Sequence, residues 1–426
     1  MKIRFVNADF RKLWIANTVS RVGSQITFVA LPLTAVILLK ATPLQMGILT
    51  ACGTLPYLLL GLPAGVWVDR LRRLPLLINA DIGRALLLAT IPLFATLEKL
   101  SIEYLYLIAF STGALTLVYD VTEEAYLPTI VEDEHLLESN SQLETINSMA
   151  QLLAPVIAGG LVQLLTAPIA ILIDSISFGW SAFWLKRIKK QEIKSTPTQP
   201  DNLWLEIRDG LSFLLRNPIL RPSLLTGFQW QLFGGMTDAI IILYLVETLH
   251  LPPAAIGLMY AIGSFSGLVA SNFTNKAVAK FGLGHIVITS ALILGFGWLF
   301  IPLAIGTSWA AFTIIATGML FVGAGNTMWN ILTSSINQAV TPNRLLGRVN
   351  ASNLFLTWGA LPLGSLIGGW LAEQWGLRST LLLACGGILF GTFWVLFSPL
   401  RSLLKIPDKK NDENQPDLIS LPEGIK

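Results

Sequence analysis

Among the charged side chains inside the long apolar runs of the sequence, three could bind a proton or pair with an opposite charge. They are Arg21 in "SRVGSQITFVALPL", Asp120 in "LVYDVTEEAY" and Asp238 in "GGMTDAI". A charged group in an apolar medium costs several kcal/mol unless it is paired or meets water, so such residues are candidates for function. Asp174, in "ILIDSIS", lies near the outer end of its run, and we expect it to be an interfacial residue without such a role.

The runs that hold these residues have the length of membrane-spanning helices. The chain has 426 residues, is 53% hydrophobic and 13% charged, and has a mean hydropathy of +0.63. Apolar runs of about 18 to 25 residues recur along it, enough to cross the hydrocarbon core of a bilayer as helices. We therefore predict an all-α integral membrane protein with twelve spans. Their predicted limits are 13–39, 47–68, 75–97, 104–122, 142–165, 168–186, 222–246, 254–275, 284–304, 308–335, 348–371 and 376–398.

The distribution of Lys and Arg predicts which side of the membrane holds the termini. Arg21 and Arg84 lie inside spans, and only Lys40, Lys99 and Arg378 fall in the odd-numbered loops. The other basic residues lie at the termini and in the even-numbered loops. Since basic loops stay in the cytoplasm, both termini of this multi-pass protein are predicted to be cytoplasmic.

One long connection divides the predicted spans into six and six. Residues 187–221 begin with a basic segment and continue as "LWLEIRDGLSFLLRNP", whose apolar residues recur at helical spacing, as in an interfacial helix. We expect a six-helix bundle over 1–186, this cytoplasmic linker, a second bundle over 222–404 and a disordered tail over 405–426. "HLLESNSQ" before span five and "RLLGRVNAS" before span eleven indicate repeated halves, which in transporters enclose a site between them.

The loop between spans two and three, "GVWVDRLRRLPLL" over 65–77, concentrates charge in an otherwise apolar region. Basic residues would hold this loop in the cytoplasm but do not explain Gly65 and Asp69. Their spacing places both on one face of a helix. The Gly lets a neighbouring backbone approach, and the Asp can then accept from the N–H groups of a helix N-terminus.

This loop resembles the signature loop of the major facilitator superfamily, G-x-x-x-D-[RK]-x-G-[RK]-[RK]. Gly65, Asp69, Arg70 and Arg73 match the pattern, whereas Arg72 stands where the family has Gly. The resemblance covers nearly the whole chain and implies two pseudo-symmetric six-helix bundles, the major facilitator fold.

The resemblance also implies a partner for the loop. In the family this Asp braces the start of span eleven when the cytoplasmic side is closed, and here "GRVNAS", with Gly347 and Arg348, is at that place. Asp81 and Arg84, three residues apart in span three, are expected to extend the charge network of the loop rather than bind substrate.

Several stretches are similar to the bacterial macrolide-efflux and siderophore-export branch, among them "LPYLLLGLPAGVWVDR" and "TPNRLLGRVNAS". In span five, Ala154, Pro155, Ala158 and Gly159 occupy the end of the family's antiporter motif, G-P-x-x-G-G, although only Pro155 and Gly159 match strictly. The motif implies an exporter. The alternative is a proline kink with small residues that permit close helix packing.

Spans one, four, seven and ten line the central cavity in the family, which implies that Arg21 and Asp120 form an ion pair or a proton-linked pair. The alternative is a structural salt bridge at the cytoplasmic rim. Asp238 is assigned a coupling or substrate role. Further candidate cavity residues, each of which could instead form a helix–helix hydrogen bond, are Gln25, Thr116, Asn147, Gln151, Gln229, Gln231, Asn326, Trp329 and Asn330.

We predict a secondary active, proton-coupled exporter in the bacterial inner membrane, a monomer that moves amphipathic small molecules such as drugs, macrolides or siderophores. The sequence has no G-x-x-x-x-G-K-[ST] loop, Ser/His/Asp arrangement or metal-ligand cluster, so neither an enzyme nor a cofactor or metal is indicated. Cys52 and Cys385 both lie in apolar runs, so neither a disulfide framework nor a metal site is indicated. A net charge of +3 is too weak to indicate a nucleic-acid partner. The alternatives are a lysophospholipid flippase of the same fold and a non-transporting membrane sensor.

Overall fold

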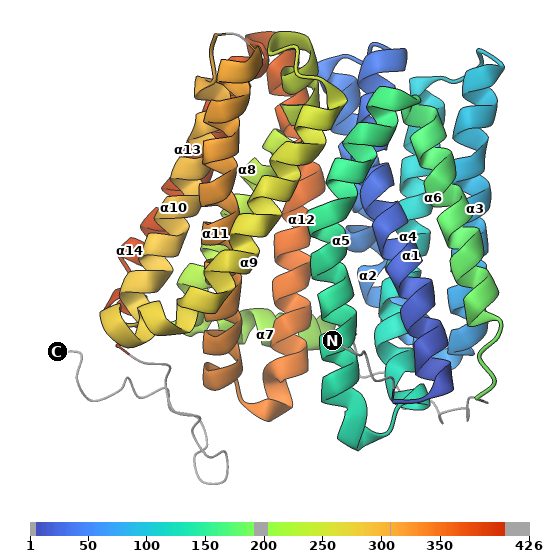
Figure 1. The fold of residues 1–426 in the computed structure, drawn as a ribbon. Coiled ribbons are helices and arrows are strands. Elements are labelled where there is room, and N and C mark those ends of the chain that lie inside the picture. The colour runs from blue at the N-terminus through green and yellow to red at the C-terminus, as the bar shows by residue number, and fades with distance from the viewer. Residues whose placement is uncertain (1–5, 191–202, 307, 405–426) are drawn as a thin grey trace.

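The computed structural model describes residues 6–190, 203–306 and 308–404, and within them the chain is almost wholly helical (Figure 1). Twelve helices are long and apolar enough to cross a membrane, which confirms the predicted fold class. The first bundle contains α1 (Ala8–Leu33), α2 (Pro43–Arg70), α3 (Arg73–Thr96), α4 (Ile102–Ile130), α5 (Leu136–Leu164) and α6 (Ala167–Leu185). The second contains α8 (Leu220–Leu243), α9 (Pro253–Phe281), α10 (Leu283–Leu303), α11 (Ser308–Val340), α12 (Asn343–Trp375), α13 (Leu377–Phe390) and α14 (Thr392–Leu396).

The amphipathic helix expected in the central connection is α7 (Leu203–Arg216), which lies crosswise to the spans (Figure 1). Its Gly210 packs against the Arg348 carbonyl and Ser352 of α12. The rest of the predicted linker, 191–202, and the predicted tail, 405–426, lie outside the described residues.

Local sequence explains where several helices begin. Thr42 and Gln45 form a capping box around Pro43 at the start of α2. Gly282 and Gly376 have φ values of 86° and 83°, which a residue with a side chain rarely adopts, and they let α10 and α13 follow their preceding helices directly.

Helix ends differ from the predicted span limits wherever a helix continues past its apolar stretch. The fourth helix extends to Ile130 rather than 122, and α12 begins at Asn343 rather than 348. The apolar run measures what crosses the hydrocarbon, whereas polar turns continue the helix into the interface and water. The twelfth span is divided at Gly391 into α13 and α14.

The two halves repeat an unusual helix ending. The first helix of each bundle passes into a π-helical turn, Thr34–Leu38 after α1 and Tyr244–Thr248 after α8. Each turn is followed two residues later by a residue of positive φ, Lys40 at 52° and His250 at 51°. Two matching irregularities at equivalent positions support the pseudo-symmetry that the sequence indicates.

The buried apolar residues show where the bundles meet. We call the end where α1 begins and α14 ends the termini end. At the opposite, far end one apolar cluster joins both bundles and includes Val29 and Ile240. At the termini end each bundle has its own cluster, with Leu13 in one and Val349 in the other. The bundles are therefore packed together at the far end, and at the termini end their described residues form separate apolar clusters.

Glycines permit the close approach at the far end. A Cβ on Gly47 of α2 would lie 2.9 Å from the Cα of Gly369 of α12. A Cβ on Gly257 of α9 would overlap the carbonyl of Pro155 of α5. Both pairs join one bundle to the other, backbone against backbone.

Candidate functional site

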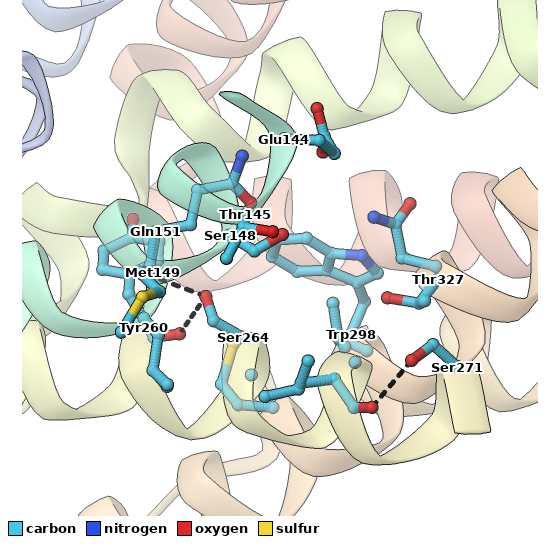
Figure 2. Close-up of a pocket in the computed structure, with 18 of the residues that line it drawn as sticks. Glu144, Thr145, Ser148, Met149, Gln151, Tyr260, Ser264, Ser271, Trp298 and Thr327 are labelled. Atoms are coloured by element: carbon cyan, nitrogen blue, oxygen red, sulfur yellow. Dashed lines mark hydrogen bonds between the residues drawn. The ribbon is translucent and has the colours of Figure 1, made fainter. Parts of the chain in front are cut away.

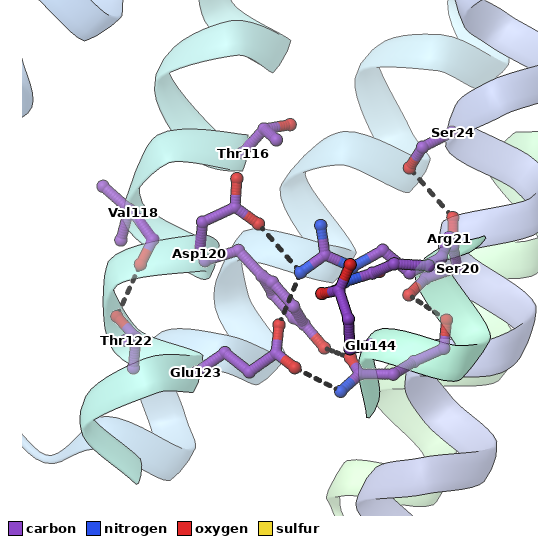
Figure 3. A network of polar contacts seen from close by, with 12 residues as sticks. Ser20, Arg21, Ser24, Thr116, Val118, Asp120, Thr122, Glu123 and Glu144 are labelled. Carbon is purple, nitrogen blue, oxygen red and sulfur yellow. Dashed lines mark hydrogen bonds and ion pairs between the residues drawn. The ribbon is translucent and has the colours of Figure 1, made fainter. Parts of the chain in front are cut away.

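A cluster of charges joins α1 to α4 within the first bundle (Figure 3). The Nη2 atom of Arg21 lies 2.7 Å from Oε2 of Glu123 and 3.3 Å from Oδ1 of Asp120. Asn17, one helical turn before Arg21, donates to the other oxygen of Glu123. The predicted Arg21–Asp120 pair is thus present, with Glu123 as the nearer partner. We call Arg21, Asp120 and Glu123 the acid cluster.

The two carboxylates of the acid cluster differ in their access to water. The side chain of Glu123 is 10% exposed, whereas that of Asp120 is 34% exposed. Asp120 also accepts from the hydroxyl of Tyr57 on α2, at 3.3 Å. One guanidinium therefore faces two carboxylates, of which Asp120 has the greater access to water.

A second pair, Asp81 and Arg84, lies buried beside the acid cluster. Arg84 bonds to Asp81, donates to Thr116 at 3.4 Å and lies between the rings of Tyr119 and Phe178. The hydroxyl of Tyr119 donates to Asn17 at 2.7 Å, which connects this pair to the acid cluster. Arg84 therefore contacts Tyr119, which is bonded to Asn17 beside the acid cluster. The sequence analysis instead expected Asp81 and Arg84 to extend the charge network of the signature loop.

Asp174 is not the interfacial residue that its position suggested. Its side chain is completely buried between α1 and α6, where it accepts from Thr27 and, at 3.0 Å, from Ser177. A Cβ on Gly23 of α1 would overlap both Asp174 and Ser177. The carboxylate therefore binds the two helices together, and the prediction was wrong because sequence does not show the neighbouring helix.

A cavity of about 800 Å³ lies between the bundles, lined mainly by α5, α9 and α11 (Figure 2). It begins near Ser141, close to the termini end of α5, and extends to Asp238 of α8. Its apolar wall includes Met149 and Met319, and its aromatic groups are Tyr260 and Trp298. Cavities of this volume hold drug-sized molecules.

Of the predicted cavity residues, Gln151, Asn326 and Asp238 line this cavity. Gln229 instead donates to the carbonyl of Gly387 and accepts from Trp394, both at 2.7 Å. These are contacts within the second bundle.

The remaining predicted cavity residues lie elsewhere. Trp329 is 5% exposed and packs on Trp230 at 4.6 Å, and Asn147 donates to Glu144. Thr116 is bonded to Arg84, as described above. Gln25, Gln231 and Asn330 are not among the residues that line the cavity.

The signature-loop residues lie at the termini end in an open arrangement. Among the residues that the structure describes, none has a heavy atom of another segment within 4 Å of a Cβ placed on Gly65 or on Gly347. Arg70 is exposed, and Arg73 approaches Thr129 of α4 at 3.5 Å. The side chain of Asp69, on which the predicted brace depends, lies outside what the structure describes.

The antiporter-like motif of α5 packs against the second bundle. Ala154 and Ala158 are completely buried, and Gly159 allows the carbonyl of Pro253 of α9 to approach. The carbonyl of Pro155 likewise faces Gly257 of α9. The motif thus forms one half of the far-end contact between the bundles.

Sequence reasoning missed several contributors to these sites. Glu123 follows Asp120 at i+3 in an apolar run, which was a usable signal. Tyr57, Tyr260 and Trp298 resemble ordinary aromatic residues of apolar spans and gave none.

Comparison with known proteins gives the family. The family model of the Major Facilitator Superfamily matches residues 13–361 and 232–421. An uncharacterized transporter of this type, YfiS of Bacillus subtilis, is 25% identical over 88% of this chain and 89% of its own length. Macrolide efflux protein A of Streptococcus pyogenes is 21% identical, with 88% and 92% covered. Multidrug efflux pump Tap of Mycolicibacterium fortuitum is 24% identical, with 89% and 93% covered.

Solved structures agree on the fold. A bacterial homologue of the iron transporter ferroportin, in its inward-facing state, matches with a TM-score of 0.74 and 18% identity, covering 92% of this chain and 99% of that one. For an outward-facing state the TM-score is 0.59, at the same coverage. The chain belongs to the Major Facilitator Superfamily and is a membrane transporter rather than an enzyme.

Proposed function

We propose that this chain is a proton-coupled exporter of amphipathic small molecules in the bacterial plasma membrane, with both termini in the cytoplasm. The observation that carries the proposal is the acid cluster, in which one arginine faces two carboxylates and the more exposed carboxylate, Asp120, is open to water.

Proton binding at Asp120 would change the bonding between α1 and α4. With both acids ionised, Arg21 is shared between Asp120 and Glu123. A proton on Asp120 cancels its charge and leaves Arg21 with Glu123 alone, which Asn17 also holds. Because interactions between charges are strong in a medium of low polarity, a single proton can favour one arrangement of these helices over another.

The arrangement of the bundles supports alternating access. The cavity extends from the termini end toward a closed far end. The basic loops favour a cytoplasmic termini end, so this conformation is the one in which an exporter loads its substrate. Release on the other side requires α2 to separate from α12, and α5 from α9, at their glycine contacts.

Export is favoured over import by two relatives whose names describe efflux, a macrolide efflux protein and a multidrug pump. The far-end contact of the antiporter-like motif is a further support, because close packing there would limit leak through the empty carrier.

Efflux of a panel of dyes and macrolides from pump-deficient bacterial cells tests the proposal, with and without a protonophore. We expect export by the wild type that collapses with the protonophore and is lost in Asp120→Asn. Glu124→Gln is the matched control, because Glu124 is exposed on the same helix outside the acid cluster. Export that survives the protonophore, or that Asp120→Asn leaves intact, contradicts proton coupling through Asp120. A correctly inserted protein that exports only lysophospholipid would instead be a flippase.

A further inference from the structure

The charged side chains that line the cavity between the bundles are all acidic. Its lining contains two acids, Glu144 and Asp238, and among the described residues that form it there is no Lys, Arg or His. Glu144 is exposed near the termini end of α5 and accepts from Asn147. Asp238 lies at the deep end, toward the far-end contact. A solute entering this space therefore meets negative charge at both depths.

Asp238 differs from the other acids within the spans. Asp81, Asp120, Glu123 and Asp174 each have a hydrogen-bond or ion-pair partner. The carboxylate of Asp238 makes neither with any described residue, although its side chain opens into the cavity. Asp238 is exposed to the cavity, so its negative charge is available to a ligand that supplies a positive charge.

The wall of the cavity that holds this carboxylate also contains aromatic side chains. Tyr260 of α9 and Trp298 of α10 line the same cavity, and Figure 2 shows both side chains directed into it. Phe28 of α1 meets the ring of Tyr260 edge to face, with centroids 5.9 Å apart, so a residue of the first bundle holds this wall in position. Ring faces attract cations, and the attraction grows where water is excluded.

We propose that Asp238, with Tyr260 and Trp298, is the anchor for an organic monocation, an apolar body that carries one substituted ammonium or similar centre. The apolar body occupies the rest of the cavity against Met149 and Met319. This assignment deepens the proposed function and depends on it for its meaning in transport. It separates the two acids that the sequence grouped together: Asp120 serves the proton, and Asp238 serves the substrate.

Tetraphenylphosphonium and tetraphenylborate test the anchor, because they share one shape and carry opposite charges. Equilibrium binding of each to the purified full chain in nanodiscs is measured for the wild type and for Asp238→Asn. We expect the wild type to bind the phosphonium at least tenfold more tightly than the borate. We expect Asp238→Asn to lose at least tenfold of the phosphonium affinity and Asp238→Glu to recover most of it.

Glu124→Gln, at an exposed acid of α4 that does not line the cavity, is the matched control and is expected to change the phosphonium affinity less than threefold. Trp298→Leu should weaken the phosphonium more than the borate, since only the cation gains from the ring face. Thermal melting of each variant separates loss of the site from loss of the fold, and Asp238→Glu keeps the test valid if Asp238→Asn unfolds.

Equal affinity for the two ions, or an Asp238→Asn variant that binds the phosphonium as the wild type does, overturns the anchor. So does binding of Mn²⁺ that depends on Asp238 while the phosphonium does not bind, because the site would then hold a metal. These measurements need no proton gradient. Binding without efflux in cells would therefore refute the proposed export and leave the anchor, whereas efflux without Asp238-dependent binding would do the reverse.

Discussion

The ring of Tyr57 stacks on the ring of Trp358, with centroids 5.6 Å apart and an interplanar angle of 26°. Tyr57 belongs to α2 of the first bundle and Trp358 to α12 of the second. The hydroxyl of the same tyrosine donates to Asp120. One side chain thus connects the acid cluster to the boundary between the bundles, which is where alternating access requires movement.

Tyr57→Phe is expected to separate the two contacts of this tyrosine. It keeps the stack on Trp358 and removes the hydrogen bond to Asp120, a bond to a charged acceptor worth about 1.5–3 kcal/mol. We expect transport to fall by roughly tenfold with little change in substrate binding. The transport rate of Tyr57→Ala should be lower still. Adding Trp358→Ala to Tyr57→Ala should lower the rate little further, because each substitution removes the same stack. Initial rates in proteoliposomes measure these effects. Fully additive losses for Tyr57→Ala and Trp358→Ala would contradict a role for the stack between the two rings.

Removing Arg21 should destabilise the protein, and removing Glu123 as well should restore much of the loss. Arg21→Gln leaves Glu123 as a buried charge without its cation. We expect a cost of about 2–3 kcal/mol, at or below the lower limit of the roughly 3–5 kcal/mol for a fully buried pair, because Arg21 is 32% exposed. Thermal melting of the purified variants checks this. An Arg21→Gln, Glu123→Gln double variant no more stable than Arg21→Gln alone would argue against the pair as the source of stability.

A side chain at the far-end contact should shift the protein toward its other conformation. The carbonyl of Pro155 stands where Gly257→Val would place a Cβ, so α5 and α9 must separate. Gly160→Val is the matched control, because no heavy atom of another segment lies within 4 Å of its Cβ.

The readout is thiol labelling of an Asn326→Cys variant lacking Cys52 and Cys385, from each side of the membrane. Gly257→Val should lower labelling from the termini side several-fold and raise it from the far side. Unchanged labelling, with the protein still folded, would contradict the view that this contact closes the far end.

The predicted brace between the signature loop and α12 should form only when the termini end closes. A Cβ built on Gly65 or on Gly347 meets open space in this conformation, so a cysteine fits at each position. In a Gly65→Cys, Gly347→Cys variant we expect disulfide formation to be slow alone and several-fold faster when Gly257→Val is added. If Gly257→Val leaves the rate of disulfide formation unchanged, then closure of the signature loop on α12 is not linked to opening of the far end.

The spans and their number were predictable because a bilayer imposes a minimum length of apolar sequence. The repeat was predictable because similar short segments, "HLLESNSQ" and "RLLGRVNAS", precede equivalent spans of the two halves. The loss of accuracy at Ile130 and Asn343 has the same cause: hydropathy marks the hydrocarbon and not the helix. The Arg21–Asp120 pair could be predicted from the family resemblance, since equivalent spans face one another in that fold.

What the sequence could not supply was the rotation of each helix. Gln229 and Trp329 are polar and aromatic residues of the expected spans, but their helices turn them into the second bundle. Asp174 looked peripheral by its position along the helix, and only the approach of Gly23 from α1 makes it central. Tertiary packing decides such cases, because an apolar membrane helix has little polar face to indicate its orientation.

The most direct test of the account is proton movement in proteoliposomes that contain the purified protein and an imposed pH gradient. Addition of a transported substrate should dissipate the gradient in the wild type and in Glu124→Gln, and Asp120→Asn should not respond while still binding substrate. If Asp120→Asn dissipates the gradient as the wild type does, or if the wild type moves substrate with no proton flux, then the acid cluster does not couple protons to transport.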